Sequence, residues 1–365
     1  MPRRTASAAA PTPAALAHAA ARLTDRDHEI LAALAVVRVL TNPMAARLWF
    51  ANAITARHRM QALAAAGVVT GFRPLRVGGG SHPVHYQLTP LGAHIAATAA
   101  GTDPEPARAA ARTALERIAA GRAYLAHTTG VAWVWTGLKA AEKDGRGALV
   151  WWGNRAAGEV YKQHKIVPDA LGTWSQDGAG PAAFALEWDT GTERHAVIID
   201  KINRYWNAHN RPSAYSSDEV TYALGTARPL LLIGVPSSGR ERALRATITR
   251  RLAELAASAA AARAEHRARH EASSRNWESY APEDQSRWIL PAATAVLGPE
   301  SDPAAAVWHP LGADVDGPLT LAELARVRFR PPAEPCPAAP AADPREAELL
   351  AEFARARELA EDELF

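Results

Sequence analysis

The sequence predicts an α/β protein (α+β overall) with a winged helix-turn-helix domain followed by a mixed β-sheet flanked by helices. Three observations predict this fold class. Residues 23–100 contain helix-periodic segments followed by two strand-like runs. From residue 107 to residue 330, helical segments alternate with short apolar runs. The 365 residues are 48% hydrophobic and 22% charged, which is enough for two hydrophobic cores.

Composition divides the chain into four parts. Residues 1–22 form an expected disordered basic arm, 23–100 the first domain, 101–330 the second, and 331–365 a Pro/Ala-rich linker with an acidic helix. No apolar run approaches the roughly 20 residues that a membrane span needs. The lone cysteine, Cys336, excludes an internal disulfide and a thiolate metal cluster. We therefore expect a cytoplasmic protein whose metal, if it has one, is bound by oxygen or imidazole ligands.

Charge is distributed unevenly along the chain. Residues 1–100 contain 10 Arg and no Lys against 3 acidic residues, a net charge of +7. Residues 331–365 contain 3 Arg against 9 acidic residues, a net charge of −6. A basic first domain indicates a polyanionic partner, because phosphate neutralisation with counterion release drives non-specific nucleic-acid binding. The acidic tail has the opposite effect and is a candidate competitor for the same surface.

The first domain reads as three helices and a hairpin. Thr24 and Asp27 begin a helix over residues 25–40, Thr41 or Asn42 caps a second short helix, and a third spans about 55–66. The strand-like runs VVTGFRPLR and HYQL, joined by GGGSH, form the expected wing, and a closing helix follows.

Five polar side chains are the predicted DNA contacts, three on an exposed side of the third helix and two on the first strand of the wing. They are Arg57, His58, Gln61, Arg73 and Arg76. The alternative is an all-α bundle with a surface hairpin and scattered arginines. His82 and His85 lack a carboxylate or cysteine partner nearby, so we expect them on the wing surface rather than at a metal.

The second domain begins with helices over about 106–127 and 131–143, followed by the strand ALVWW. Further strands are VPDALGTW, PAAFALEWD, RPLLLIGV and ILPAATAVL. Helices are expected over 193–208 and about 240–269, and VWHPLG with LTLAEL reads as a sheet-edge segment and a capping helix. The continuous apolar run of RPLLLIGV is typical of a strand with helices on both sheet faces.

The stretch from Val167 to Trp206 contains the candidate chemistry. In FALEWD, apolar residues alternate with Glu187 and Asp189, so one face of the strand carries two carboxylates. Asp169 enters the preceding strand, and Lys201 lies at the edge of the apolar stripe of the following helix. Carboxylates that converge at a sheet edge hold Mg²⁺ or Mn²⁺, and a nearby lysine stabilises charge that develops on a phosphodiester. Asp169, Glu187, Asp189 and Lys201 are therefore the predicted catalytic residues.

The run PDA, LEWDTGTE and KINRY resembles the PD-(D/E)xK nuclease superfamily. More narrowly, residues 23–330 resemble the replication-relaxation family of plasmid and conjugative-element proteins, which is similar to relaxases of the MobC class. The resemblance implies a restriction-endonuclease-like sheet in which Asp169 and Glu187 bind the metal. Asp189 occupies the usual lysine position of that motif, and Lys201 replaces the lysine from a migrated position. Where the family pattern has a further glutamate, this chain has Asn154, with Glu159 five residues later.

Two hypotheses about function follow. The first is a DNA-binding protein of a mobile element that nicks or holds a strand during plasmid transfer or replication. The second is an inactive DNA-binding regulator or accessory factor whose α/β domain serves for dimerisation or docking, with the acids paired to Lys201, Arg194 and Arg204. The expected partners are double-stranded DNA, a nicked or single strand, a second copy of the chain, and conjugation or replication proteins reached through the acidic tail. No membrane partner is expected. Tyr205 has the spacing of a packing residue rather than of a covalent nucleophile.

Overall fold

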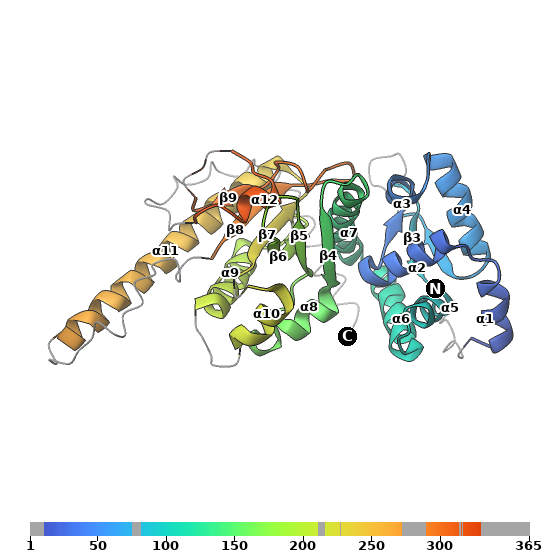
Figure 1. Cartoon of the computed structure of the whole chain (residues 1–365), viewed down its shortest axis with the longest axis horizontal. Helices are drawn as coiled ribbons and strands as arrows, with labels where there is room; N and C mark the ends of the chain where they lie inside the picture. Colours follow the sequence, from blue (N-terminus) through green and yellow to red (C-terminus); the bar gives the residue numbers. More distant parts are fainter. Residues whose placement is uncertain are drawn as a thin grey trace. The chain divides into compact units, whose positions relative to one another are not determined.

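A computed structural model describes residues 11–74, 82–210, 216–226, 228–271, 290–313, 315 and 317–329. The fold combines helices with two sheets and divides into two compact units (Figure 1). Unit 1 comprises Met1–Asp144 with Pro299–Ser301, and unit 2 comprises Gly145–Gly298 with Asp302–Phe365. Among the described helices, none has the length and hydropathy required to cross a bilayer.

Unit 1 contains seven helices and a small sheet within its described residues. The helices are α1 (Pro13–Ala20), α2 (Asp25–Val37), α3 (Asn42–Trp49), α4 (Ala53–Ala65), α5 (Pro90–Ala99), α6 (Pro104–Ala120) and α7 (Arg122–Lys143). The strands β1 (Leu40–Thr41), β2 (Val69–Phe72) and β3 (His85–Leu88) form an antiparallel sheet in the order β1-β3-β2. The chain therefore runs helix, strand, helix, helix, strand, strand before α5.

The first helix of unit 1 corrects the expectation of a disordered arm over residues 1–22. Thr12 caps α1 by accepting a hydrogen bond from the backbone N–H of Ala15, and Pro13 occupies the first turn. A capping hydroxyl, a proline at the first position and an alanine-rich interior together favour a helix. Residues 1–10 lie outside the described part of the chain.

Helix α2 ends earlier than its apolar periodicity indicates. Arg38 adopts a left-handed conformation with φ of 68°, which terminates the helix after Val37. The chain then enters β1, which pairs with β3 through Leu40 and Tyr86. From the sequence, this helix was expected to end at Leu40. Its true end could not be recognised, because the left-handed residue is Arg38 and not the glycine that usually marks such a position. His85 also differs from expectation, since it is 5% exposed and its ring stacks on Phe72 rather than lying on the surface.

Unit 2 is built on one six-stranded mixed sheet in the order β4-β5-β6-β7-β8-β9. The β6–β7 and β7–β8 pairs are parallel, and the other three pairs are antiparallel. The strands are β4 (Ala148–Gly153), β5 (Ala170–Ser175), β6 (Ala182–Trp188), β7 (Leu230–Val235), β8 (Ala292–Val296) and β9 (His309–Leu311). The predicted mixed sheet is therefore present, with β7 buried along its whole length.

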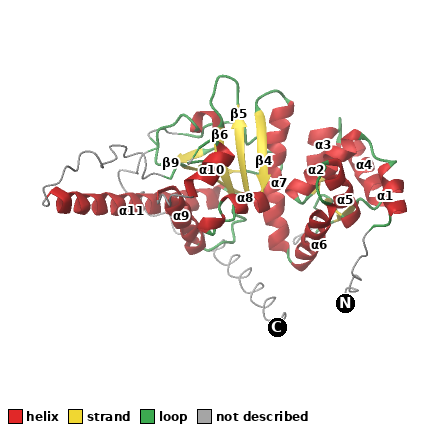
Figure 2. Cartoon of the chain, turned by 60° about the horizontal axis from the view of Figure 1, so that its bottom comes forward, coloured by secondary structure: helices red, strands yellow, loops and turns green. Residues whose placement is uncertain are grey.

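Helices lie beside this sheet and are drawn in red next to its yellow strands (Figure 2). They are α8 (Asn154–Val160), the 3-10 turn η1 (Lys162–His164), α9 (His195–Asn210), α10 (Ser216–Leu224), α11 (Ser238–Glu271) and α12 (Leu321–Leu324). Apolar residues of α8, α9, α10 and α11 share one buried cluster with one face of β5, β6 and β7. Glu187 lies on the same face of β6 as Ala183 and Ala185, so its carboxylate points to the side covered by α9.

The helices α6 and α7 belong to unit 1, although the sequence assigned residues 101–144 to the second domain. Helix α6 packs against α5, and α7 packs against α2 and α3. The polar linker at Gly101–Pro106 therefore joins two helices of one unit. The expected acidic helix and Cys336 lie outside the described residues.

Candidate functional site

Two acidic residues meet where β5 begins and β6 ends. The last paired residues of these strands are Ala170 and Leu186, so Asp169 and Glu187 follow side by side. The backbone N–H of Asp169 donates to the carbonyl of Leu186 at 3.0 Å. The backbone N–H of Trp188 donates to Oδ2 of Asp169 at 2.7 Å. The antiparallel register of β5 and β6 therefore brings together two predicted ligands that lie 18 residues apart in the chain.

Glu187 is buried and fully hydrogen-bonded. Its Oε2 accepts from Nζ of Lys201 at 3.1 Å, and its Oε1 accepts from the hydroxyl of Tyr205 at 2.8 Å. Burial and, after it, the negative charge of Asp169 together raise the pKa of Glu187 to about 7, against the opposing effects of Lys201 and Tyr205. This carboxyl can therefore change its protonation state near neutral pH.

Lys201 connects Glu187 to a third acid. Its Nζ also donates to Oε1 of Glu193 at 3.3 Å. Burial lowers the pKa of Lys201, but the charges of Glu187, Glu193 and Asp169 outweigh that effect and raise the pKa overall. Lys201 therefore remains an ammonium group that faces several carboxylates.

Glu193 is the last residue of the motif LEWDTGTE, but its place in the site was not predicted from the sequence. Its second oxygen, Oε2, is buried and has no hydrogen-bond partner among the described residues. Glu193 was expected as the first residue of the helix over 193–208, but α9 begins at His195 and Glu193 lies before it. Its position at the expected helix end gave no sign that it would face Lys201. An acid six residues after Glu187 was the only available signal.

Asp189 has different partners from the other acids. Its Oδ2 accepts from Nε of Arg240 at 2.5 Å, and its Oδ1 accepts from the backbone N–H of Gly191 at 2.9 Å. The guanidinium of Arg240 also donates to the carbonyl of Glu193 at 2.6 Å. Arg240, at the start of α11, therefore neutralises Asp189 and holds the turn that carries Glu193. From the sequence, Arg194 and Arg204 were among the expected partners of the acids. No sequence pattern links residue 189 to residue 240.

A small cavity of about 20 Å³ lies between these side chains, bounded among others by Glu187, Asp189, Glu193 and Lys201. Such a volume holds about one water molecule or one small ion. Within the described residues, no three His, Cys, Asp or Glu side chains form a ready metal-binding group. Mg²⁺ is commonly bound through one or two carboxylates with water completing its shell. Asp169 and Glu187 have the carboxylate oxygens that such a cation takes, but Asp169 is not among the described residues that line this cavity.

Asn154, at the position where the family pattern has a further glutamate, directly follows the neighbouring strand β4. Gly153 of β4 pairs with Ala170 of β5, so Asn154 follows at the same sheet edge as Asp169, and it is exposed at the start of α8. Glu159 is exposed and forms an ion pair with Lys162 at 3.4 Å. It therefore has a partner of its own, and the structure does not show it compensating for Asn154.

Tyr205 supports Glu187 from inside the core. It is 1% exposed, its ring packs edge-on against Tyr161, and it stacks on His209. Burial and the charge of Glu187 raise the pKa of Tyr205 well above its usual value. A phenol that is buried and hydrogen-bonded in this way cannot reach a DNA strand, which agrees with the packing interpretation.

The predicted DNA contacts lie on unit 1. Arg57, His58 and Gln61 are exposed on α4, and Arg73 is exposed directly after β2. Arg76 lies outside the described residues. The remaining arginine of α4, Arg59, points the other way: it forms an ion pair with the fully buried Asp27 of α2, with Nε 2.8 Å from Oδ1. Arg59 therefore anchors α4 rather than facing solvent.

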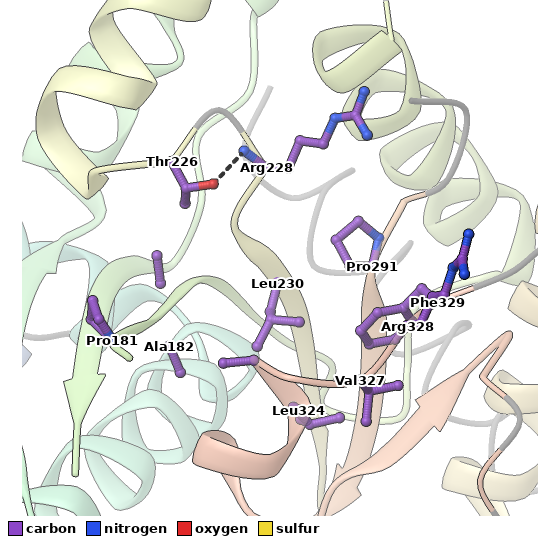
Figure 3. A pocket seen from close by; sticks show the side chains of 12 residues that line it. Pro181, Ala182, Thr226, Arg228, Leu230, Pro291, Leu324, Val327, Arg328 and Phe329 are labelled. Atoms are coloured by element: carbon purple, nitrogen blue, oxygen red, sulfur yellow. Dashed lines mark hydrogen bonds between the residues drawn. The ribbon is translucent and has the colours of Figure 1, made fainter. Parts of the chain in front are cut away.

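A larger cavity of about 370 Å³ lies at the opposite end of β6 and β7 (Figure 3). It is lined by apolar side chains such as Leu230, Leu324 and Phe329, with Arg228 and Arg328 as its charged residues. None of the described residues that line it is a carboxylate. It is therefore separate from the acid and lysine cluster, which lies where β6 ends.

The chain matches the model of a known protein family. The model of a family described as replication-relaxation matches residues 31–214. The matched segment extends from α2 beyond the end of α9, so it includes α4, the β2–β3 hairpin and every acid of the cluster around Lys201. No curated protein and no solved structure matches the chain.

Proposed function

This chain belongs to the replication-relaxation family, and on that premise we propose that it binds duplex DNA through α4 and the β2–β3 hairpin during DNA replication or mobilisation. The family description supports a role in replication. The contact surface is our own assignment, and it rests on the geometry of unit 1.

The order of elements in unit 1 is the observation that carries the proposal. Helix α2, strand β1, helices α3 and α4, and the β2–β3 hairpin follow one another as in a winged helix-turn-helix, with the sheet order β1-β3-β2. In that motif the last helix enters the major groove and the hairpin contacts the backbone. Here the last helix is α4, which exposes Arg57, His58 and Gln61, and Arg73 lies at the hairpin.

Equilibrium binding to duplex DNA at fixed salt tests the proposal. Arg57→Ala and Arg73→Ala should each weaken binding, by about 1–3 kcal/mol where the arginine makes a bidentate contact. Arg122→Ala is the matched control, since Arg122 is an exposed arginine at the start of α7. Equal affinities of the wild type and both variants would exclude this surface.

A second candidate function is phosphodiester cleavage by unit 2, and the meeting of Asp169, Glu187 and Lys201 favours it. A divalent cation held by Asp169 and Glu187 would supply Lewis-acid stabilisation and lower the pKa of a bound water. Lys201 keeps its positive charge next to Glu187 and can stabilise negative charge on a phosphate. Tyr205 fixes the Glu187 carboxylate in this position. Asn154 at the neighbouring edge is a weaker cation ligand than an acid, which lowers the expected metal affinity.

Nicking of supercoiled plasmid in Mg²⁺ or Mn²⁺ tests this second function, with the transfer-origin DNA of the protein's own mobile element as substrate. The wild type should convert supercoiled to open-circular DNA, and Lys201→Ala should lose that activity. Lys162→Ala is the control, because Lys162 is an exposed lysine that forms an ion pair with the exposed Glu159. No nicking by the wild type would favour the alternative function, a DNA-binding regulator or accessory factor that uses unit 2 for dimerisation or docking.

A further inference from the structure

Helix α4 exposes a large apolar residue on the same face as its polar side chains. Ile54, the second residue of α4, is 63% exposed, whereas Ala56, Met60 and Leu63 are buried on the opposite side. Ile54 lies three, four and seven positions before Arg57, His58 and Gln61, so all four lie on one stripe of the helix. Most of the Ile54 side chain is therefore accessible to solvent and lies outside the core of unit 1.

Two contacts fix this face of α4 in place. Asn52 caps the helix, its Oδ1 accepting from the backbone N–H of Thr55 at 2.9 Å. Arg59, from the inner side of the helix, binds the buried carboxylate of Asp27 on α2. Ile54 is therefore presented from the first turn of a helix that is tied down both at its start and in its middle.

The chemistry of the stripe matches the edges of base pairs in the major groove. Arginine pairs with guanine, glutamine pairs with adenine, and the 5-methyl group of thymine offers an apolar contact to an apolar side chain. In helix-turn-helix proteins the N-terminal residues of the recognition helix contact base edges. Ile54 lies in that first turn, and no other large apolar residue of α4 is exposed.

We propose that Ile54 contacts the 5-methyl group of a thymine and so determines part of the DNA sequence that the protein recognises. This inference rests on the proposed DNA-binding function and adds a base preference to it. Ile54 acts beside Arg57 and Gln61, whose hydrogen-bonding groups suit the neighbouring purines.

The test uses the full chain and a duplex selected from a random-sequence pool by binding to the wild type. Each thymine of that duplex is replaced in turn by deoxyuridine, which removes only the methyl group. At one thymine position the wild type should lose about three- to fivefold in affinity, the change expected for one buried methyl. Ile54→Ala should bind the thymine and deoxyuridine duplexes equally at that position.

The matched control is Val36→Ala, since Val36 of α2 is also an exposed apolar residue of unit 1, at 38%. It should retain the wild-type preference for thymine. Equal binding of all deoxyuridine duplexes by the wild type would overturn the inference, as would an Ile54→Ala variant that keeps the preference. If those outcomes accompany salt-dependent DNA binding, the DNA-binding function stands and only the role of Ile54 fails. Absence of DNA binding by the wild type would overturn both.

Discussion

The roles of Glu187 and Asp189 depend on partners that lie far away in the sequence. Alternation in FALEWD was sufficient to predict that Glu187 and Asp189 share a face, and helical spacing placed Lys201 on the next helix. The partners that separate their roles could not be predicted in this way. Glu187 is held by Lys201 and Tyr205, whereas Asp189 is held by Arg240, 51 residues later in the chain. Such pairs depend on tertiary packing, which local periodicity does not encode.

Asp27 shows the same dependence and allows a prediction about pH. Burial would raise its pKa, but hydrogen bonds from Arg59 and Thr24 outweigh burial and lower the pKa below the ordinary value of an aspartate, 3.8. Because the folded-state pKa is depressed, the pair stabilises the fold above the unfolded-state pKa. That stabilisation is lost as the pH falls through the folded-state pKa.

Asp27→Asn should therefore lower the free energy of unfolding at pH 7 by roughly 1.5–3 kcal/mol, the range for hydrogen bonds to charged groups. The difference from the wild type should shrink as the pH falls below about 4. Chemical denaturation at a series of pH values measures it. Asp25→Asn is the control, because Asp25 is exposed in the same turn of α2. A difference that stays constant from pH 7 to pH 2 would contradict the assigned role of the Asp27–Arg59 pair.

Elements with strong periodicity or strong caps were predictable from the sequence. Helices α4, α5 and α9 and strands β6 and β7 all lie close to their expected positions. Five short elements of the described residues were not predicted, and α8 and η1 are among them. Strand β1 has two residues and follows an unmarked left-handed Arg38, α1 was hidden in an alanine-rich arm, and α10 lies in a polar segment without a clear apolar stripe. Short elements bury few side chains, so their sequences carry little periodic signal.

One glycine fixes how α5 meets the β2 segment. A Cβ atom on Gly92 would lie 1.9 Å from the carbonyl oxygen of Val68. Thr89, which caps α5, donates its hydroxyl to the carbonyl of Gly67 at 2.6 Å and accepts from the backbone N–H of Gly92 at 3.1 Å. The first turn of α5 is therefore pressed against the backbone that leads into β2.

Gly92→Ala should lower the stability of the protein, by about 1–3 kcal/mol or more, because the methyl group has no space next to a backbone carbonyl. In an ordinary helix interior the same substitution stabilises by roughly 1 kcal/mol. The sign of the change therefore tests the packing. Thermal denaturation measures it, and a variant as stable as the wild type or more stable would show that α5 is not held this closely.

At the scale of the whole molecule, the sequence predicted two folded domains but not where they divide. The second compact unit begins at Gly145, since α6 and α7 pack within unit 1. A polar Pro/Gly linker at 101–106 suggested an earlier division, because composition cannot distinguish a loop inside a domain from a loop between domains. The charge asymmetry is a property of the full sequence: +7 over residues 1–100 against −6 over residues 331–365. It concentrates positive charge in the part of the chain that contains α4 and the hairpin.

The salt dependence of duplex binding by the full chain tests the central claim, that this family member binds DNA phosphates through unit 1. The logarithm of the association constant should fall linearly with the logarithm of salt concentration. The slope should become less steep by about one unit in Arg73→Ala and should not change in Arg122→Ala. Binding whose slope is the same in the wild type and in Arg73→Ala, or no binding to duplex DNA at all, would contradict the account.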